Sequence, residues 1–451
     1  MMKKYWFCLL LPLCLVLSGR ADAELSARAA RKNALFRVGE TIVFSVVASD
    51  QAPPNAEYRY TVTGGGKTLQ SGTLNMTDGK GEISVTPEKP GFVLLAIEIP
   101  QRGADKKPGP VLAGAGVSVD KIKAGTPKTP RFDQFWQEKI RELRSRKYTV
   151  DIRKVEEKHD PRAQVYDVRI SDGKLNVTGY MVLPASPVKG GHPLLMMFNG
   201  AGTIGANYRS AIQRVIRYDM IVFNLSIHDV PNGLSPQEQG KISRERHLAG
   251  YMYRGVSNPE DYPICEIFLR GVRALDYMKT RPEWNGRDIV TQGGSLGGAQ
   301  ALFAASIEPK TVLCIANAPA LSDHFGASAG HLPGWPNLFA KLAGGKLPAD
   351  SVEQTASFFD TVNIARNVRC PIHLSVGFID RICPPDSIYA LYNSLTQKKT
   401  IVNVVTGEHG PVIDPTEKSV FIQNMEYMDR LFLKKRSGKS GKSGKSGKNR
   451  K

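Results

Sequence analysis

The chain has 451 residues, more than one compact core usually holds, and its composition of 41% hydrophobic and 23% charged residues is typical of a globular protein. Its formal net charge of +19 would suggest a nucleic-acid ligand if it were spread over the fold. However, nine Lys and Arg and no acidic residue lie in residues 434–451, so the charge belongs mainly to a tail. We therefore expect no nucleic-acid partner.

Residues 1–23 have the pattern of an export signal. Two lysines precede an apolar run over residues 5–17, and Ala-Asp-Ala at 21–23 provides the small residues that a signal peptidase needs. The apolar run is too short to cross roughly 30 Å of hydrocarbon, and no later segment is apolar for long enough. We predict a secreted or periplasmic protein that has no integral membrane span.

Four cysteines follow the expected signal, which is too few for a disulfide framework in a chain of this length. Cys370 and Cys383 flank an apolar run that resembles a strand, which would hold them about 20 Å or more apart. We expect both to be buried thiols, and a bridge that involves Cys265 stays open.

Residues 24–122 are predicted to form an immunoglobulin-like β-sandwich, because short alternating runs are separated by Gly- and Pro-rich turns, with no helical stretch between them. A sandwich of this kind acts either as a carbohydrate-binding module or as a spacer or contact domain. We favour the spacer, because no exposed aromatic platform is recognisable. The expected strands lie at 41–47, 58–62, 81–85, 92–99 and 111–119.

Residues 123–434 are predicted to form an α/β domain with a largely parallel central sheet, entered through a linker at 121–130 and an amphipathic helix at 132–143. Residues 435–451 repeat Ser-Gly-Lys and should be disordered. The domain's other expected strands and helices alternate; the strands lie at 165–170, 178–183, 194–198, 220–225, 288–291, 311–316, 372–376 and 400–405, and the helices at 209–218, 264–280, 296–306 and 387–395.

Gly-Gly-Ser-Leu-Gly at 293–297 is the strongest local motif. It follows an expected strand and opens an Ala-rich helix, which is the setting that a G-x-S-x-G nucleophile elbow of an α/β-hydrolase requires. A side chain at Gly293 or Gly297 would collide with the facing strand and helix. We predict that Ser295 is a catalytic nucleophile, although such a run also occurs as a structural glycine-rich turn.

A nucleophilic serine needs a base and an orienting acid, which follow it in the order Ser, Asp, His in this fold. Asp380 and His409 each lie just beyond an expected strand, at the edge where α/β sheets gather their sites. We predict these two as the triad partners of Ser295. Asp386 is the reserve acid and Glu408 a more distant one.

The oxyanion of an acyl transfer needs two backbone N–H donors. We assign them to Leu296, which follows the nucleophile, and to Ala201 in the glycine-containing loop after the expected strand at 194–198. No zinc-binding spacing occurs, and the glycine run at 64–66 is not a phosphate loop. We expect neither a metal nor another cofactor.

From residue 132 to 433 the chain resembles the acetyl xylan esterases and cephalosporin C deacetylases. The resemblance implies a serine deacetylase in which Ser295, Asp380 and His409 are nucleophile, acid and base. It rests on Phe-Asp-Gln-Phe-Trp at 132–136, Gly-Tyr-Met-Val-Leu-Pro at 179–184, Leu-Arg-Gly-Val-Arg-Ala-Leu-Asp at 269–276, Gly-Gly-Ser-Leu-Gly-Gly at 293–298, Phe-Asp-Thr-Val-Asn at 359–363, Cys-Pro at 370–371 and Ser-Val-Gly-Phe-Ile-Asp-Arg-Ile-Cys-Pro-Pro at 375–385.

Three departures from the family's pattern alter the expected pocket walls. The family usually has His-Gly-Tyr where this chain has Asn-Gly-Ala at 199–201, and Gln where this chain has Leu296. Its Arg-Gly-Gln loop is replaced around residues 226–229. The family is typically hexameric and lacks an N-terminal sandwich, so the sequence leaves a homo-oligomer open.

The expected activity is removal of acetyl groups from acetylated xylan or xylo-oligosaccharides through an acyl-enzyme. One alternative is a peptidase of the prolyl oligopeptidase type, but an N-terminal region of about 100 residues cannot form the propeller of such enzymes. The other alternative is an inert sugar-binding protein on the same fold, against which the complete set of triad residues argues.

Overall fold

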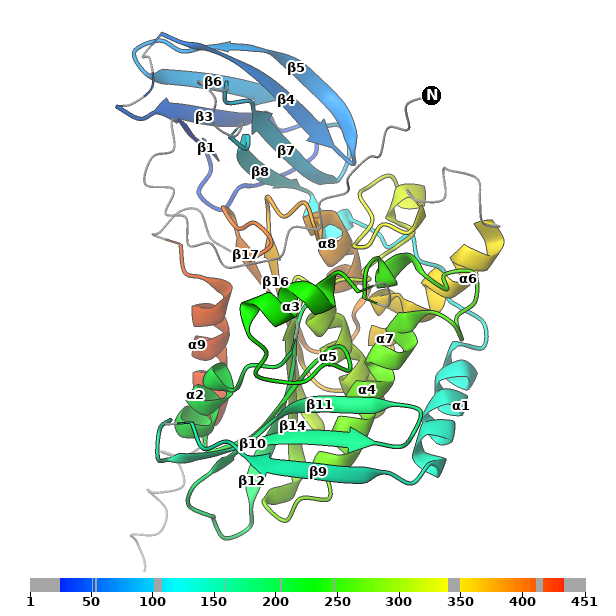
Figure 1. Ribbon diagram of the computed structural model, residues 1–451. Helices are drawn as coiled ribbons and strands as arrows, with labels where there is room; N and C mark the ends of the chain where they lie inside the picture. The colour runs from blue at the N-terminus through cyan, green and yellow to red at the C-terminus, as the bar shows by residue number, and fades with distance from the viewer. Residues whose placement is uncertain are drawn as a thin grey trace, which may run out of the picture.

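The structure is a computed structural model of the chain. It describes residues 25–50, 52, 55–100, 108–157, 159–202, 205–245, 248–339, 349–410 and 417–433, so the expected export signal and basic tail lie outside the described residues. None of the helices in these ranges is long and apolar enough to cross a membrane. Figure 1 shows a β-rich part, drawn in blue, seated on a larger α/β part.

The N-terminal part is a β-sandwich of two sheets. A three-stranded sheet has the order β1-β3-β6, and a five-stranded sheet has the order β2-β8-β7-β4-β5. All pairs are antiparallel except β2 with β8. Alternate residues of β3 are buried, as expected for a strand with one face on the core. The strands are β1 (Leu25–Ala29), β2 (Leu35–Phe36), β3 (Ile42–Ala48), β4 (Glu57–Gly64), β5 (Lys67–Asn75), β6 (Lys80–Val85), β7 (Gly91–Ile97) and β8 (Val111–Val117).

The C-terminal part is built on a nine-stranded sheet with the order β17-β16-β15-β14-β12-β13-β11-β10-β9. In this order, the neighbouring strands from β17 to β13 pair in parallel. β11, β10 and β9 continue the sheet at one edge as antiparallel strands. The predicted α/β class is therefore confirmed. The strands are β9 (Thr149–Lys154), β10 (Ala163–Ser171), β11 (Asn176–Pro184), β12 (His192–Phe198), β13 (Ile221–Leu225), β14 (Trp284–Gly294), β15 (Thr311–Asn317), β16 (Ile372–Gly377) and β17 (Lys399–Val404).

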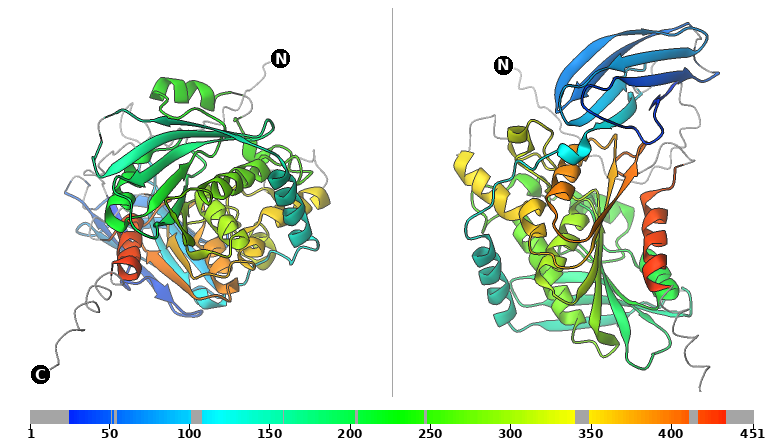
Figure 2. Two further views of the ribbon diagram at one scale, coloured as in Figure 1. Left: turned by 90° about the horizontal axis from the view of Figure 1, so that it is seen from below. Right: turned by 180° about the vertical axis from the view of Figure 1, so that it is seen from behind.

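Helices cover both faces of the large sheet. Figure 2 shows α2 and α9 on one face and α1, α4, α5 and α8 on the other. Side chains of successive strand residues point to opposite faces of the sheet. Leu195 and Val222 belong to the hydrophobic cluster under α2. Met196 and Phe223, the next residues along each strand, belong to the cluster under α4 and α5. The helices are α1 (Phe132–Ser145), α2 (Tyr208–Tyr218), α3 (Pro236–Ser243), α4 (Pro263–Met278), α5 (Leu296–Ile307), α6 (Ala349–Phe359), α7 (Thr361–Ala365), α8 (Pro385–Ser394) and α9 (Val420–Phe432), with 3₁₀ turns η1 (Val119–Lys121), η2 (Tyr251–Tyr253) and η3 (Gly326–Ala329).

The four cysteines of the described ranges are buried and free, so Cys265 forms no disulfide with any of them. The expectation of buried thiols at Cys370 and Cys383 is confirmed. Burial raises the pKa of Cys370 to about 11, which keeps this thiol protonated and unreactive near neutral pH.

The sandwich packs directly on the α/β part through β7. The Phe92 ring lies 4.9 Å from the Phe378 ring in an edge-to-face contact. The Phe92 backbone N–H donates to Asp386 Oδ1 at 3.0 Å. A Cβ at Gly114 of β8 would lie 2.4 Å from the Phe378 carbonyl oxygen, so only glycine permits this approach. The two parts therefore share one continuous hydrophobic core.

The expected linker at 121–130 is anchored by hydrogen bonds to two buried carboxyl groups. Thr126 contacts Asp323 Oδ1 and Asp360 Oδ2 through its hydroxyl, each at 2.7 Å. Because a hydroxyl has one proton, it donates to one carboxylate and accepts from the other group in its protonated form. Burial, together with the nearby charge of Asp323, raises the pKa of Asp360 to about 7, so Asp360 is the member of the pair that takes up the shared proton as the pH falls toward neutrality.

His331 joins the same cluster, with an acceptor facing each ring nitrogen. Its Nδ1 lies 3.1 Å from the Leu332 carbonyl, and its Nε2 lies 3.0 Å from the Lys123 carbonyl and 3.2 Å from Asp323 Oδ2. Only the imidazolium donates from both nitrogens. Burial opposes this charge, but the Asp323 hydrogen bond and nearby carboxylates outweigh it and raise the pKa of His331 to about 9.

We predict that His331→Gln destabilises the protein in a pH-dependent way. A pKa raised above the unfolded value of about 6.5 contributes stability that is fully present below pH 6.5 and is lost as pH rises through about 9. The difference in Tm between wild type and variant should therefore be largest near pH 6 and should nearly disappear by about pH 9.5. Equal Tm differences at the two pH values would contradict a charged His331.

Candidate active site

Ser295 lies between β14 and α5 in a strained backbone conformation, with φ of 57° and ψ of −126°. Its N–H donates to the Asn317 carbonyl of β15 at 2.9 Å. A Cβ at Gly293 would lie 2.2 Å from the Gly297 carbonyl oxygen, and a Cβ at Gly297 would lie 2.2 Å from that of Phe198. The two glycines thus let strand, turn and helix approach closely enough to hold the serine in this conformation.

Three side chains from separate strand ends form one hydrogen-bonded chain. His409, which follows β17, has Nε2 at 2.9 Å from Ser295 Oγ and Nδ1 at 2.7 Å from Asp380 Oδ2. Asp380 follows β16, and its Oδ1 accepts the backbone N–H groups of Ile382 and Cys383 at 2.8 and 2.9 Å. The carboxylate is buried and the imidazole is 18% exposed. The structure thus brings together all three residues of the predicted triad.

The donor and acceptor roles follow from the carboxylate. An ionised Asp380 only accepts, so Nδ1 of His409 carries the proton that it donates to Oδ2. Nε2 is then the acceptor of the hydrogen bond that the Ser295 hydroxyl donates. The reserve acid, Asp386, is engaged elsewhere by the Phe92 N–H, and burial raises its pKa to about 6. The structure therefore pairs His409 with Asp380 rather than with the reserve acid.

The two predicted oxyanion donors flank the serine. Leu296 is the first residue of α5, so its N–H has no partner inside the helix. The loop of Ala201 passes beside the nucleophile, since a Cβ at Gly200 would lie 3.5 Å from Ser295 Cβ. Across the described ranges, the Ala201 N–H donates to no acceptor. Among the described residues, neither amide therefore has an acceptor that would compete with a ligand oxygen.

Polar side chains that no sequence motif marks hold this loop in place. Asn199 Nδ2 donates to Asn224 Oδ1 and to the Leu225 carbonyl, each at 2.7 Å. Gln300 of α5 donates to the Asn199 carbonyl at 3.2 Å. Two of these polar residues interrupt an apolar stretch: Asn224 lies in a buried strand and Gln300 in an Ala-rich helix. This interruption is the signal from which the sequence could have identified them.

Cys383 is a further residue whose place beside the serine the sequence did not predict. Its buried thiol interacts with the Ser295 hydroxyl and with the Trp335 backbone. Burial raises the pKa of Cys383 well above its ordinary value, so the thiol is neutral and is not itself a nucleophile. It therefore acts as part of the wall beside the serine.

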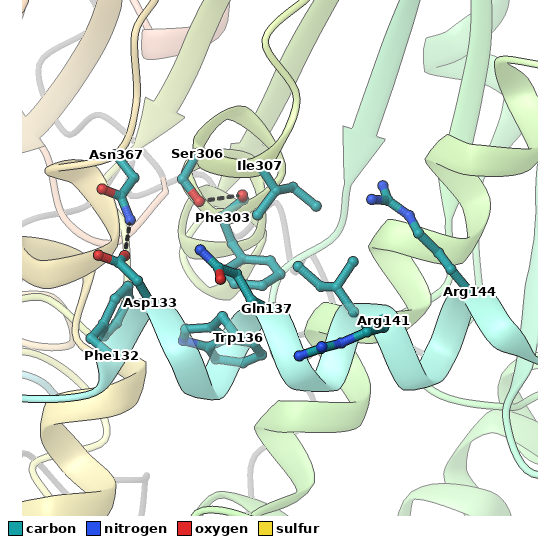
Figure 3. A pocket seen from close by; sticks show the side chains of 11 residues that line it. Phe132, Asp133, Trp136, Gln137, Arg141, Arg144, Phe303, Ser306, Ile307 and Asn367 are labelled. Carbon is teal, nitrogen blue, oxygen red and sulfur yellow. Dashed lines mark hydrogen bonds between the residues drawn. The ribbon is translucent and has the colours of Figure 1, made fainter.

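A cavity of about 510 Å³ lies against α1 and is remote from this constellation. Figure 3 shows Phe303, Ser306 and Ile307 of α5 facing Trp136 and Arg141 of α1 across it. Phe303 lies eight residues along α5 from Ser295, about 12 Å at 1.5 Å per residue. This cavity is therefore not where an acyl group would meet the serine. No group of three or more His, Cys, Asp or Glu in the described parts of the chain could hold a metal ion.

Comparisons with known proteins agree with this architecture. The family model for acetyl xylan esterase matches residues 117–424. Acetyl esterase Axe7A of Xylanibacter ruminicola is 28% identical over 370 residues, covering 79% of this chain and 80% of that protein.

Two solved structures share the fold. They are the acetyl xylan esterase from Paenibacillus sp. R4, 22% identical, and acetyl xylan esterase 1 from Thermoanaerobacterium sp. JW/SL YS485, 19% identical. Each has a TM-score of 0.58, and each comparison covers 70% of this chain and 98% of the other. The predicted fold class, an α/β-hydrolase preceded by a β-sandwich, is confirmed. The chain therefore belongs to the acetyl xylan esterase family and is a carboxylic ester hydrolase.

Proposed function

We propose that the protein is a serine esterase that removes acetyl groups from acetylated xylan or xylo-oligosaccharides. The observation that carries the proposal is the hydrogen-bonded chain from Ser295 Oγ through His409 to Asp380. Such a chain activates a hydroxyl for attack on an ester carbonyl. Membership of the acetyl xylan esterase family supports acetyl as the group removed.

In the proposed mechanism, His409 Nε2 takes the proton of Ser295 as Oγ bonds to the acetyl carbonyl carbon. The tetrahedral intermediate then collapses, the bond to the sugar oxygen breaks, and His409 returns the proton to that oxygen. Water attacks the acetyl-serine by the same steps and releases acetate. Asp380 keeps Nδ1 protonated throughout and stabilises the imidazolium.

The negative charge on the tetrahedral intermediate develops on the former carbonyl oxygen. We assign its stabilisation to the backbone N–H groups of Leu296 and Ala201, which flank the serine and have no acceptor among the described residues. The strained φ at Ser295 supports this assignment, because it holds the hydroxyl at the N-terminus of α5 where negative charge is favoured.

The proposed place of action is outside the cytoplasm, because polymeric xylan cannot enter a cell. The export pattern of residues 1–23 supports secretion or a periplasmic location. The basic residues of 435–451 would attract an anionic surface at low salt.

We predict that acetate is the preferred acyl group. Each methylene that a tight acyl pocket excludes changes rates by about 1–3 kcal/mol, so kcat/KM for acetate should exceed that for butyrate by roughly tenfold or more. The measurement compares acetate, butyrate and octanoate esters of one alcohol, alongside acetylated xylan and aminoacyl-proline amides. A butyrate or octanoate optimum would favour a broader carboxylesterase, and cleavage of the amides would favour the peptidase alternative.

A further inference from the structure

A cavity of about 340 Å³ lies where the sandwich meets the α/β part. Sandwich residues of the β4–β5 turn and of β7 form one side of it. The other side comes from the loop at 332–337 and from residues 378–386, which include the acid Asp380. Figures 1 and 2 show the sandwich directly above α8 and the ends of β16 and β17, where these loops emerge.

Two glycines allow the sandwich to close this cavity. Gly65 and Gly66, at the turn between β4 and β5, have φ of 55° and 79°. A Cβ at Gly65 would lie 2.5 Å from the Gly330 carbonyl oxygen, and one at Gly66 would lie 2.9 Å from Leu332. Only a turn without side chains can approach the α/β loop this closely. The glycine run at 64–66 therefore forms a wall of the cavity. A turn between two strands would not by itself need glycines that fit so closely against another part of the chain.

The cavity borders the catalytic constellation along two routes. Asp380 lies in its wall, and one imidazole ring with its two hydrogen bonds separates that carboxylate from Ser295 Oγ. Trp335 also lies in the wall, and its backbone interacts with the Cys383 thiol that contacts the Ser295 hydroxyl. Ser295, His409 and Cys383 are not themselves part of the lining, so only a ligand much longer than an acetate ester could reach both the serine and this cavity.

The lining has the chemistry of a sugar subsite. Trp335 is half-buried, and its ring packs against no other aromatic ring of the described residues. Leu332 and Ile382 are 37% and 48% exposed, so they offer apolar surface to a ligand. Arg381 is exposed and forms no ion pair with any described carboxylate, which leaves its donors for hydroxyl groups. Apolar walls with few polar donors bind the C–H faces and hydroxyls of a pyranose.

We infer that this cavity binds the sugar units next to the acetylated one in a neutral oligosaccharide chain, with the sandwich as one of its walls. The inference rests on the proposed deacetylase function and assigns the sandwich a part in substrate binding rather than the role of a spacer. The volume of about 340 Å³ lies in the range of ligand pockets. A small acetate ester does not extend beyond the serine, whereas an oligosaccharide would fill the cavity.

The test compares two acetate esters on the full chain: acetylated xylotetraose and p-nitrophenyl acetate. Trp335→Ala is expected to raise KM for acetylated xylotetraose about five- to tenfold more than KM for p-nitrophenyl acetate. Leu332→Ala should change the ratio of the two KM values in the same direction. Because the Leu332 side chain is already partly exposed, this variant keeps the test valid if Trp335→Ala unfolds. Leu69→Ala is the matched control, because this leucine is 47% exposed on β5 and lies outside the cavity lining.

Calorimetry with unacetylated xylotetraose on the Ser295→Ala chain separates this inference from the proposed function. Binding that Leu332→Ala or Trp335→Ala weakens at least fivefold supports the subsite, even if the wild-type chain hydrolyses neither ester and the proposed function fails. Unchanged binding and an unchanged KM ratio in both cavity variants overturn the subsite. The proposed function still stands in that case if the wild-type chain releases acetate.

Discussion

Ser295→Ala is expected to lower kcat for p-nitrophenyl acetate by roughly four to six orders of magnitude, the loss seen when an acyl-transfer enzyme loses its nucleophile. The methyl group cannot form the acyl-enzyme, although the amides of Leu296 and Ala201 and the imidazole of His409 stay in place. The residual rate reflects these groups acting on a water molecule. Steady-state kinetics of the purified variant, together with its Tm, measure the effect.

Ser306→Ala provides the matched control, because Ser306 lies on the same helix near its far end. Its hydroxyl donates only to the Phe303 carbonyl at 2.7 Å, so its loss should leave the rate within a factor of two. Undiminished acetate release by a folded Ser295→Ala chain would remove this serine from the mechanism and, with it, the acyl-enzyme.

Asp380→Asn is expected to lower kcat by about four orders of magnitude. The amide oxygen can still accept the N–H groups of Ile382 and Cys383, which leaves the amide nitrogen facing His409 Nδ1. Nδ1 must then become the acceptor, and the proton moves to Nε2. The imidazole can no longer take the proton of Ser295, so the loss comes from the wrong tautomer rather than from a collapsed site.

Two observations distinguish this explanation from simple unfolding. The Tm of Asp380→Asn should stay close to that of wild type, because the amide keeps the local hydrogen bonds. Asp386→Asn, at the reserve acid, should lower kcat less than about tenfold, because Asp386 contacts the Phe92 N–H and not the imidazole. A larger loss in Asp386→Asn than in Asp380→Asn would transfer the role of acid to Asp386.

Strands that form buried apolar runs were predictable, and strands whose residues are mostly exposed were not. The runs at 194–198 and 372–376 are apolar and end at turn residues, and they correspond to β12 and β16 with bounds shifted by at most two residues. β5 and β9 were absent from the expected strands, because most of their residues are exposed and polar. Such edge strands form through pairing with a neighbour, which no local pattern encodes.

Some residues of the candidate site could likewise be predicted from the sequence, and others could not. A glycine-flanked serine after a strand, and an acid and a histidine after later strands, could be found because parallel strands end at one edge of a sheet. The positions of Asn199, Gln300 and Cys383 around the serine could not, because their partners come from other segments of the chain. The triad's catalytic role stays a prediction that the two variants above test.

The sequence by itself determined the α/β class, the order of its buried central strands and the residues able to carry acyl transfer, because these depend on local apolar patterns and on motifs a few residues long. The tertiary structure alone decided that the sandwich closes a cavity beside Asp380 and that the linker docks on Asp323 and Asp360. Contacts of this kind join residues about 200 or more positions apart, and their energies depend on close approach and burial. Neither quantity exists until the chain has folded.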